Sequence, residues 1–193
     1  MLKVQTLSSG SGGNITLVGS ITTNILVDIG LTLPQTLKRL QSAKINPKQI
    51  DAILITHEHS DHISGVSAFV KKYGVKIYCH TKCKKTLTKF LELDDSHFHE
   101  YDDIFTIGDI TVNYFVVPHD STFCFGYTFT VDDTTVGIAT DVGKMTPAIL
   151  SNLALCQLVI LECNHDKQKL QCNTKYPYWL KRRIAGGRGH LSN

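Results

Sequence analysis

The feature that most constrains this chain is a dense group of metal-ligand side chains directly after an apolar segment. Residues 50–55 have the composition of a buried strand, and residues 63–70 begin a helical pattern. Between them, residues 56–62 hold three His and two carboxylates in seven positions. A strand fixes the backbone, and a following loop lets imidazoles converge on one point, where neutral imidazole and a carboxylate suit zinc. A polar loop with hydrogen-bonded histidines is the alternative, but three His at this spacing favour a metal site.

The overall composition is that of an ordinary globular protein. The chain has 193 residues, of which 42% are hydrophobic and 19% charged, so we predict one domain over residues 1–193 with a sizeable core. Its net charge of +3 does not indicate which class of molecule it binds. It starts in a strand-like pattern without the apolar run of a signal peptide, and its apolar runs are too short to span a membrane. We therefore expect a cytoplasmic protein without membrane contact, of unknown oligomeric state.

The six cysteines favour free thiols over disulfides. None forms a C-x-x-C pair. Four of them (Cys79, Cys124, Cys156 and Cys163) lie in or beside apolar runs. Cysteine in such segments behaves as a small apolar residue, so we expect buried free thiols.

The hydrophobic periodicity predicts an α/β protein. Expected strands cover 4–7, 15–18, 24–30, 50–55, 75–79, 105–107, 110–112, 114–117, 123–131, 135–139 and 158–161. Expected helices cover 33–43, 63–73, 82–91, 145–155 and 178–184, with Gly74 ending the second and Leu87, Phe90 and Leu91 facing the core in the third. His97 and His99 fall in a polar connection and are expected at the surface.

The segment 8–14 (Ser-Ser-Gly-Ser-Gly-Gly-Asn) is expected to join the first two strands as a wide hairpin loop. It matches neither the phosphate-binding loop of nucleotide hydrolases nor the dinucleotide fingerprint. Two interpretations stay open: a plain loop, or a backbone cradle at the rim of the site.

Polar residues recur directly after apolar strands. They are Asp28, the group at 57–62, His119, Asp141 and the segment 162–165. Functional sites of layered α/β folds lie beyond strand ends, where the backbone is rigid and the side chains are free. We therefore expect these groups to meet. The alternatives are a structural role for His119, a helix cap for Asp141, and a surface position for His190 in the Gly-rich tail.

The motif H-x-H-x-D-H at 57–62, the later His119, Asp141 within Ala-Thr-Asp-Val-Gly, and His190 resemble the metallo-β-lactamase superfamily along the whole chain. The segments 9–14, 162–166 and 189–193 further resemble its YycJ/WalJ-type hydrolases, which are regarded as nuclease-like phosphodiesterases. The resemblance implies a four-layer αββα sandwich with two divalent metal ions, Zn²⁺ or alternatively Mn²⁺, at one edge of the sheets. It assigns His57, His59 and His119 to the first metal, Asp61, His62 and His190 to the second, and Asp141 to both.

The chain departs from that subgroup in two places. Cys163 stands where the subgroup usually has Ser. Relatives also continue well beyond the position of Asn193 and supply the last strands and helices of the second half. We therefore expect the C-terminal part of the sandwich to be incomplete within residues 1–193, whether as a fragment or as a short version.

The resulting hypothesis is a metal-dependent hydrolase, specifically a dinuclear phosphodiesterase or exonuclease-like nuclease acting on DNA or RNA. Two metal ions would activate water and offset charge on the phosphate oxygens. Asp61 would ligate a metal and orient the nucleophile. His165 is a candidate for protonating the leaving oxygen, with a structural role as the alternative. Asp28, Glu58 and Asp120 are candidates for fixing imidazole tautomers.

The C-terminal segment supports nucleic acid as the substrate. Residues 167–193 contain no acidic residue, and their seven Lys and Arg are interleaved with aromatics, a composition that suits phosphate contacts and base stacking. We name as candidate substrate-binding residues Ser11, Asn14, Lys181, Arg182 and Arg183. The alternative is a solvated basic helix face, which is also our interpretation of the lysines at 82–89.

Two other functions remain open on the sequence. In related enzymes, metal centres with the same ligand residues hydrolyse thioesters and other small substrates. A truncated domain that binds nucleic acid without a closed metal site is the non-catalytic alternative, and metal content would distinguish it.

Overall fold

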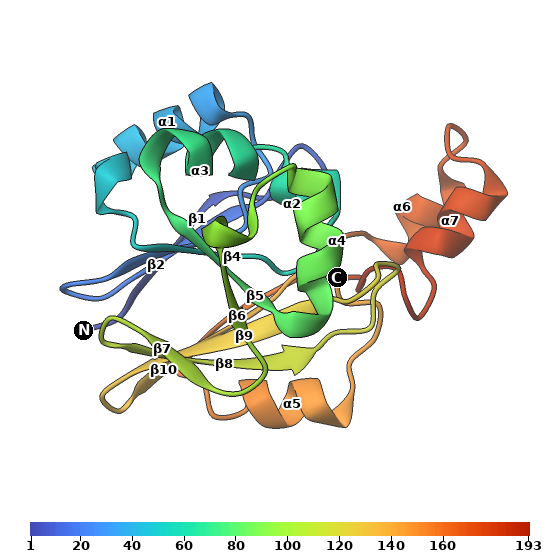
Figure 1. Cartoon of the computed structure of the whole chain (residues 1–193). Coiled ribbons are helices and arrows are strands. Elements are labelled where there is room, and N and C mark those ends of the chain that lie inside the picture. Colours follow the sequence, from blue (N-terminus) through green and yellow to red (C-terminus); the bar gives the residue numbers. More distant parts are fainter.

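The computed structural model describes residues 1–193 as two mixed β-sheets packed face to face (Figure 1). The first sheet has six strands, in spatial order β1 (Lys3–Ser8), β2 (Ile15–Gly19), β3 (Asn24–Val27), β4 (Ala52–Leu54), β5 (Lys76–His80) and β6 (Phe98–Tyr101). The pairs β1–β2 and β2–β3 are antiparallel, and β3 to β6 run parallel. The carboxyl ends of these parallel strands therefore meet at one edge.

The second sheet has five strands, in spatial order β11 (Leu158–Leu161), β10 (Thr134–Ala139), β9 (Phe125–Val131), β8 (Ile110–Val116) and β7 (Phe105–Ile107). Its pairs are antiparallel except β10–β11, which is parallel. The edge strand β11 leaves Leu158, Val159 and Leu161 exposed, although apolar residues on both faces are typical of a covered strand.

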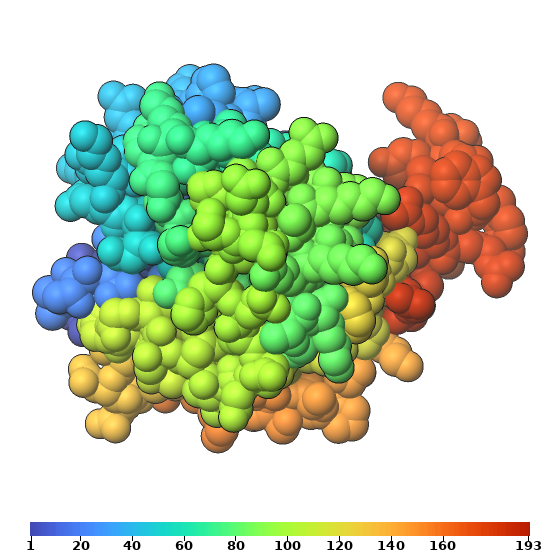
Figure 2. Space-filling model, viewed as in Figure 1, coloured from blue at the N-terminus to red at the C-terminus, as the bar shows by residue number.

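Helices cover both outer faces, so the predicted four-layer αββα sandwich is confirmed (Figure 1). On the first sheet lie α1 (Leu33–Ser42), α2 (Ser60–Ile63), α3 (Val66–Tyr73) and α4 (Thr81–Leu91). On the second sheet lies α5 (Pro147–Leu153). Two further helices, α6 (Lys167–Cys172) and α7 (Tyr178–Ile184), stand out from the body at one side (Figure 2).

Local sequence explains several helix boundaries. Thr32 and Gln35 form a reciprocal capping box with Pro34 in the first turn, which starts α1. Gly74 ends α3 with a left-handed φ of 70°, as predicted. None of the helices combines the length and the apolar character that crossing a membrane requires.

The main hydrophobic core lies between the sheets and under the helices of the first sheet, and it comprises 35 buried residues. Every residue of β4 is buried because both faces of that strand are covered. Helix α3 contributes Phe69 to this core, and strand β9 of the second sheet contributes Phe129. This core holds the strand that leads into the His group.

Several boundaries differ from the prediction. The strand expected at 24–30 ends at Val27 because Asp28 has a left-handed φ of 61°. The helix expected at 63–73 is broken at Gly65, where a Cβ would lie 2.1 Å from the Leu31 carbonyl oxygen. The strands expected at 110–112 and 114–117 are one strand, β8.

Other expectations were wrong or incomplete. Phe90 is 61% exposed, and Cys83 takes the inward position on α4 with Leu87 and Leu91. The polar connection contains β6, which alternation had not revealed because its two central residues, His99 and Glu100, are both polar. His99 is exposed and His97 half-buried. All six cysteines are free, as predicted, but of the four expected to be buried, Cys156 is half-buried and Cys163 is exposed.

Candidate metal centre

The polar residues that follow different strands converge at one edge of the two sheets. Ligand atoms of His57, His59 and His119 lie within 4.8 Å of one another, and so do those of His57, His62 and Asp141. A third group of the same kind joins Asp141, Glu162 and His190. The convergence inferred from strand ends is therefore present, and it includes the C-terminal His190.

Tight backbone contacts hold the loop that carries this group. Asn14 N–H donates to the Asp61 carbonyl (2.8 Å), and Gly30 N–H donates to the Asn14 carbonyl (2.9 Å). A Cβ on Gly30 would lie 1.7 Å from the Asp61 carbonyl oxygen. The Gly-rich loop before Asn14 thus lies at the rim of the site, and only glycine fits at position 30.

We predict that Gly30→Ala disrupts the centre, because the added methyl must displace backbone rather than a flexible side chain. The expected loss is on the order of 2 kcal/mol of unfolding free energy, with reduced metal uptake. Thermal denaturation and metal analysis would measure both. Gly12→Ala is the matched control, since its Cβ meets no atom within 4 Å. Equal effects of the two variants would contradict this account.

Two of the three histidines of the first group, His57 and His119, are buried, and His59 is partly exposed. The His57 ring lies 4.6 Å from that of His59 and 5.0 Å from that of His119, centroid to centroid. Burial lowers the pKa of His57 to about 2 and also lowers the pKa of His119. His57 Nε2 is buried and has no hydrogen-bond partner. A buried ring nitrogen of this kind calls for a partner, and a bound metal ion would supply one.

His62 is oriented by a buried carboxylate from another strand end. Its Nδ1 lies 2.7 Å from Asp28 Oδ2, and the Thr56 hydroxyl donates to the same oxygen (2.8 Å). Although burial opposes it, the Asp28 and Asp141 carboxylates raise the pKa of His62 to about 10. With Nδ1 engaged, Nε2 faces Asp141 Oδ2 at 2.6 Å. Carboxylate–histidine pairs of this type fix the ring nitrogen that faces a metal.

His190 is held in the same manner. Its Nδ1 lies 2.6 Å from Glu162 Oε1 and 3.2 Å from Asp141 Oδ1, and these two carboxylates raise the pKa of His190 to about 10. Glu162 is fixed in turn, because its Oε2 accepts from the Val142 N–H (2.7 Å). The sequence placed Glu162 after a strand but assigned it no role; its pairing with His190 follows only from the tertiary structure.

We predict that Glu162→Gln weakens metal binding at His190 by about 10- to 100-fold, as removal of an outer carboxylate generally does. Titration of the metal-free chain with zinc would measure the change in affinity and stoichiometry. Glu100→Gln, on β6 and exposed, removes a carboxylate away from the centre and should leave the titration unchanged. Identical zinc curves for all three proteins would show that Glu162 does not support the site.

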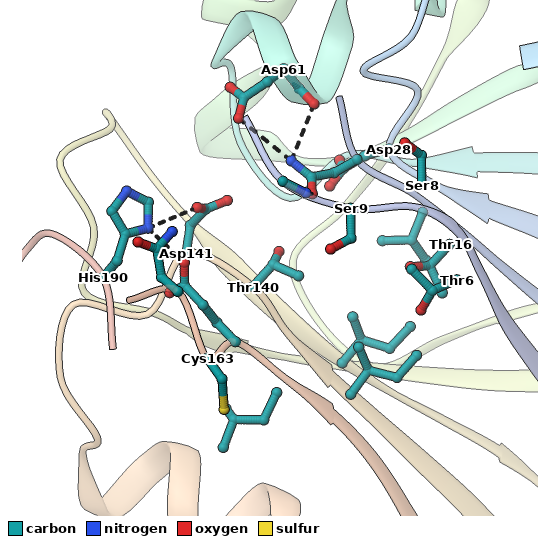
Figure 3. Close-up of a pocket in the computed structure, with 18 of the residues that line it drawn as sticks. Thr6, Ser8, Ser9, Thr16, Asp28, Asp61, Thr140, Asp141, Cys163 and His190 are labelled. Carbon is teal, nitrogen blue, oxygen red and sulfur yellow. Dashed lines mark hydrogen bonds and ion pairs between the residues drawn. The ribbon is translucent and has the colours of Figure 1, made fainter. Parts of the chain in front are cut away.

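Asp61 occupies a different position from the other predicted ligands. Its Oδ2 lies 3.7 Å from His62 Nε2, and its side chain is 31% exposed. The Asn14 amide nitrogen lies 3.0 Å from His62 Nε2 and 3.5 Å from Asp61 Oδ2. Figure 3 shows Asp61, Asp141 and His190 around one shared space. The Asp61 carboxylate is therefore accessible from the same pocket as the predicted ligands Asp141 and His190.

The donor set fits divalent metal ions. Imidazole and carboxylate are the groups that hold zinc in proteins, and the orphaned His57 Nε2 needs a partner. The residues present therefore fit a metal site of the predicted kind.

The remaining candidate residues lie at varied distances from the centre. Ser11 and Asn14 line the pocket shown in Figure 3. His165 is half-buried with an unpartnered Nδ1, and its carbonyl accepts from Asn193 N–H (3.0 Å). The basic residues of α7 lie outside the pocket lining. Lys181 donates to the Gln171 carbonyl, and Arg182 lies 5.9 Å from the Tyr178 ring centre.

Of the other predicted outer partners, Asp120 lies beside two imidazoles of the centre, whereas Glu58 bonds a backbone N–H of the loop after His119 instead. Asp120 Oδ1 lies 3.2 Å from His119 Nε2 and 4.0 Å from His59 Nε2, and Arg183 forms an ion pair with its other oxygen. Glu58 accepts from the Thr122 N–H (2.7 Å). Arg183 thus links α7 to the loop of His119.

Comparison with known proteins agrees with this geometry. The family model described as the beta-lactamase superfamily domain matches residues 23–192. The chain belongs to the metallo-β-lactamase superfamily. Within it, the chain is 36% identical to exodeoxyribonuclease WalJ of Streptococcus pneumoniae, over 99% of this chain and 72% of that protein. It is 32% identical to exodeoxyribonuclease YycJ of Bacillus anthracis, over 100% of this chain and 74% of that protein.

Solved structures show the same fold at lower identity. The metallo-β-lactamase fold protein YhfI of Bacillus subtilis matches with a TM-score of 0.71 and 20% identity, over 99% of this chain and 77% of that one. The short form of human tRNase Z matches with a TM-score of 0.69 and 19% identity, over 100% of this chain and 85% of that one. At these identities the likeness establishes the metallo-β-lactamase fold alone.

Proposed function

We propose that this metallo-β-lactamase-fold chain is a metal-dependent phosphodiesterase that degrades DNA from strand ends. The observation that carries the proposal is the convergent His and Asp centre beside an open pocket, in a chain similar over its whole length to two exodeoxyribonucleases. RNA as the substrate and hydrolysis of a thioester or another small substrate are the alternatives that the experiment below separates.

The residues of the chain would have different roles around the metal ions. Two divalent ions would supply activated water and charge compensation for the phosphate. His57, His59, His119, His62, His190 and Asp141 would hold them, with Asp61 as the accessible carboxylate that orients the attacking water. Asp28 and Glu162 would keep His62 and His190 in position through their 2.7 and 2.6 Å contacts.

Proton delivery and strand binding would fall to the C-terminal segment. His165 has an unpartnered ring nitrogen close in sequence to Glu162, and burial lowers the pKa of His165, so its neutral form would need to gain a proton before donating one to the leaving oxygen. Arg182 is exposed, while Lys181 and Arg183 already make contacts within the chain. Arg182 is therefore the cation of α7 with the fewest competing partners.

The test is degradation of a 5′-phosphorylated, end-labelled DNA duplex with zinc or manganese, beside single-stranded DNA and RNA. We expect metal-dependent loss of label that a chelator abolishes. Loss from RNA alone would change the assigned substrate. Absence of cleavage of every nucleic acid by the metal-loaded chain would refute the proposal and favour a thioester or another small substrate. Failure to bind metal at all would favour a domain that only binds nucleic acid.

A further inference from the structure

The pocket beside the centre continues as a groove between the two sheets, with a cavity of about 400 Å³. Metal-ligand residues Asp61, Asp141 and His190 lie at one end, and Thr6 and Thr16 at the other (Figure 3). Clefts of this volume hold small organic ligands. The groove is thus large enough for more than the reacting phosphate.

The two walls of the groove differ in chemistry. One wall, from β1, β2 and the loop between them, presents the hydroxyl side chains of Thr6, Ser8, Ser9, Ser11 and Thr16. The opposite wall, from β10 and β11, presents the apolar side chains of Ile138, Ile160 and Leu161. A ligand that fits both walls has an apolar face and several hydrogen-bonding groups.

Two further observations specify this ligand. No Lys or Arg lines the groove, and its charged groups are the carboxylates and His190 at the metal end. A second phosphate group of a ligand would therefore have no cationic side chain to bind in the part of the groove away from the metal end. In addition, Thr140 Oγ1 is buried without a hydrogen-bond partner in the wall of the groove, which calls for a polar group from a ligand.

We propose that this groove holds the terminal nucleoside of a nucleic-acid strand, with its phosphodiester at the metal end. A deoxyribose and base supply the neutral polar groups and the flat apolar face that the walls require. Occupation by one terminal nucleoside would make the enzyme release mononucleotides. This assignment rests on the proposed function and deepens it.

The test fills the groove from its exposed rim with Ser9→Trp. Ser9 is exposed on a loop, so the variant should fold; Ser42→Trp, also exposed but on α1, is the control. Two chromogenic diesters are compared, thymidine 5′-(p-nitrophenyl phosphate) and methyl p-nitrophenyl phosphate. Ser9→Trp should raise KM roughly 10-fold for the nucleoside-bearing diester alone, because the indole ring occupies space that the nucleoside needs and the binding energy of the subsite is lost. Equal effects on both diesters, or on neither, would overturn the proposal.

A binding measurement tests the nucleoside groove independently of the proposed nuclease function. If the unmodified chain cleaves neither diester nor DNA, the proposed function fails, and the groove is tested by calorimetry with thymidine 5′-monophosphate and with inorganic phosphate. Binding of the nucleotide that exceeds binding of phosphate, and that Ser9→Trp abolishes, would still support a nucleoside site. Equal binding of both ligands, or none, would refute it.

Discussion

The variants His59→Ala and Asp61→Ala are each expected to lose hydrolysis by on the order of 10³-fold, because each removes a proposed metal ligand or the group proposed to orient the attacking water. Both side chains are partly exposed, at 28% and 31%. Their truncation therefore leaves no large internal cavity, and the fold should persist. Initial rates on labelled DNA, with circular dichroism and thermal denaturation on the same samples, would measure the two effects separately.

A histidine outside the centre supplies the control. His99 is exposed on β6, so His99→Ala removes an imidazole without touching the ligand set and should keep full activity. Full activity in His59→Ala or Asp61→Ala would show that the ligand assignment is wrong. Loss of folding in either variant would instead show that these residues are mainly structural.

The largest expected effect on stability comes from Phe69→Ala. Phe69 is fully buried on α3 and belongs to the main core. Removing its ring deletes buried apolar surface and leaves a cavity, which costs about 3–5 kcal/mol. For a chain of this length, that loss lowers the melting temperature by roughly 10 °C. Denaturant unfolding followed by fluorescence or circular dichroism would give the free energy directly.

The control variant also tests one of the corrections to the sequence prediction. Helical spacing had placed Phe90 in the core, whereas the structure leaves it 61% exposed. Phe90→Ala should therefore change the unfolding free energy by only about 0.5 kcal/mol. A loss for Phe90→Ala as large as that for Phe69→Ala would mean that the helix α4 is rotated relative to this structure.

Local patterns determined much of the fold in advance. The apolar segment before His57 predicted a buried strand, and the structure has β4 there. The clustered His and Asp after it favoured a metal centre over a polar loop. Polar residues after other strands pointed to the same place, because strand ends of a sheet share an edge. Gly74 and the apolar spacing of α1 fixed helix boundaries for reasons contained within a few residues.

Features that depend on pairing between distant segments were decided by the tertiary structure. Asp28 orients His62 from 34 residues away, and Glu162 orients His190 from 28 residues away. The inward face of α4 depends on how the helix docks, so spacing alone could not distinguish Phe90 from Cys83. The groove exists because β1 and β2 face β10 and β11 across the two sheets. Sequence determined which groups this protein would bring together, and sheet order and packing decided which of them touch.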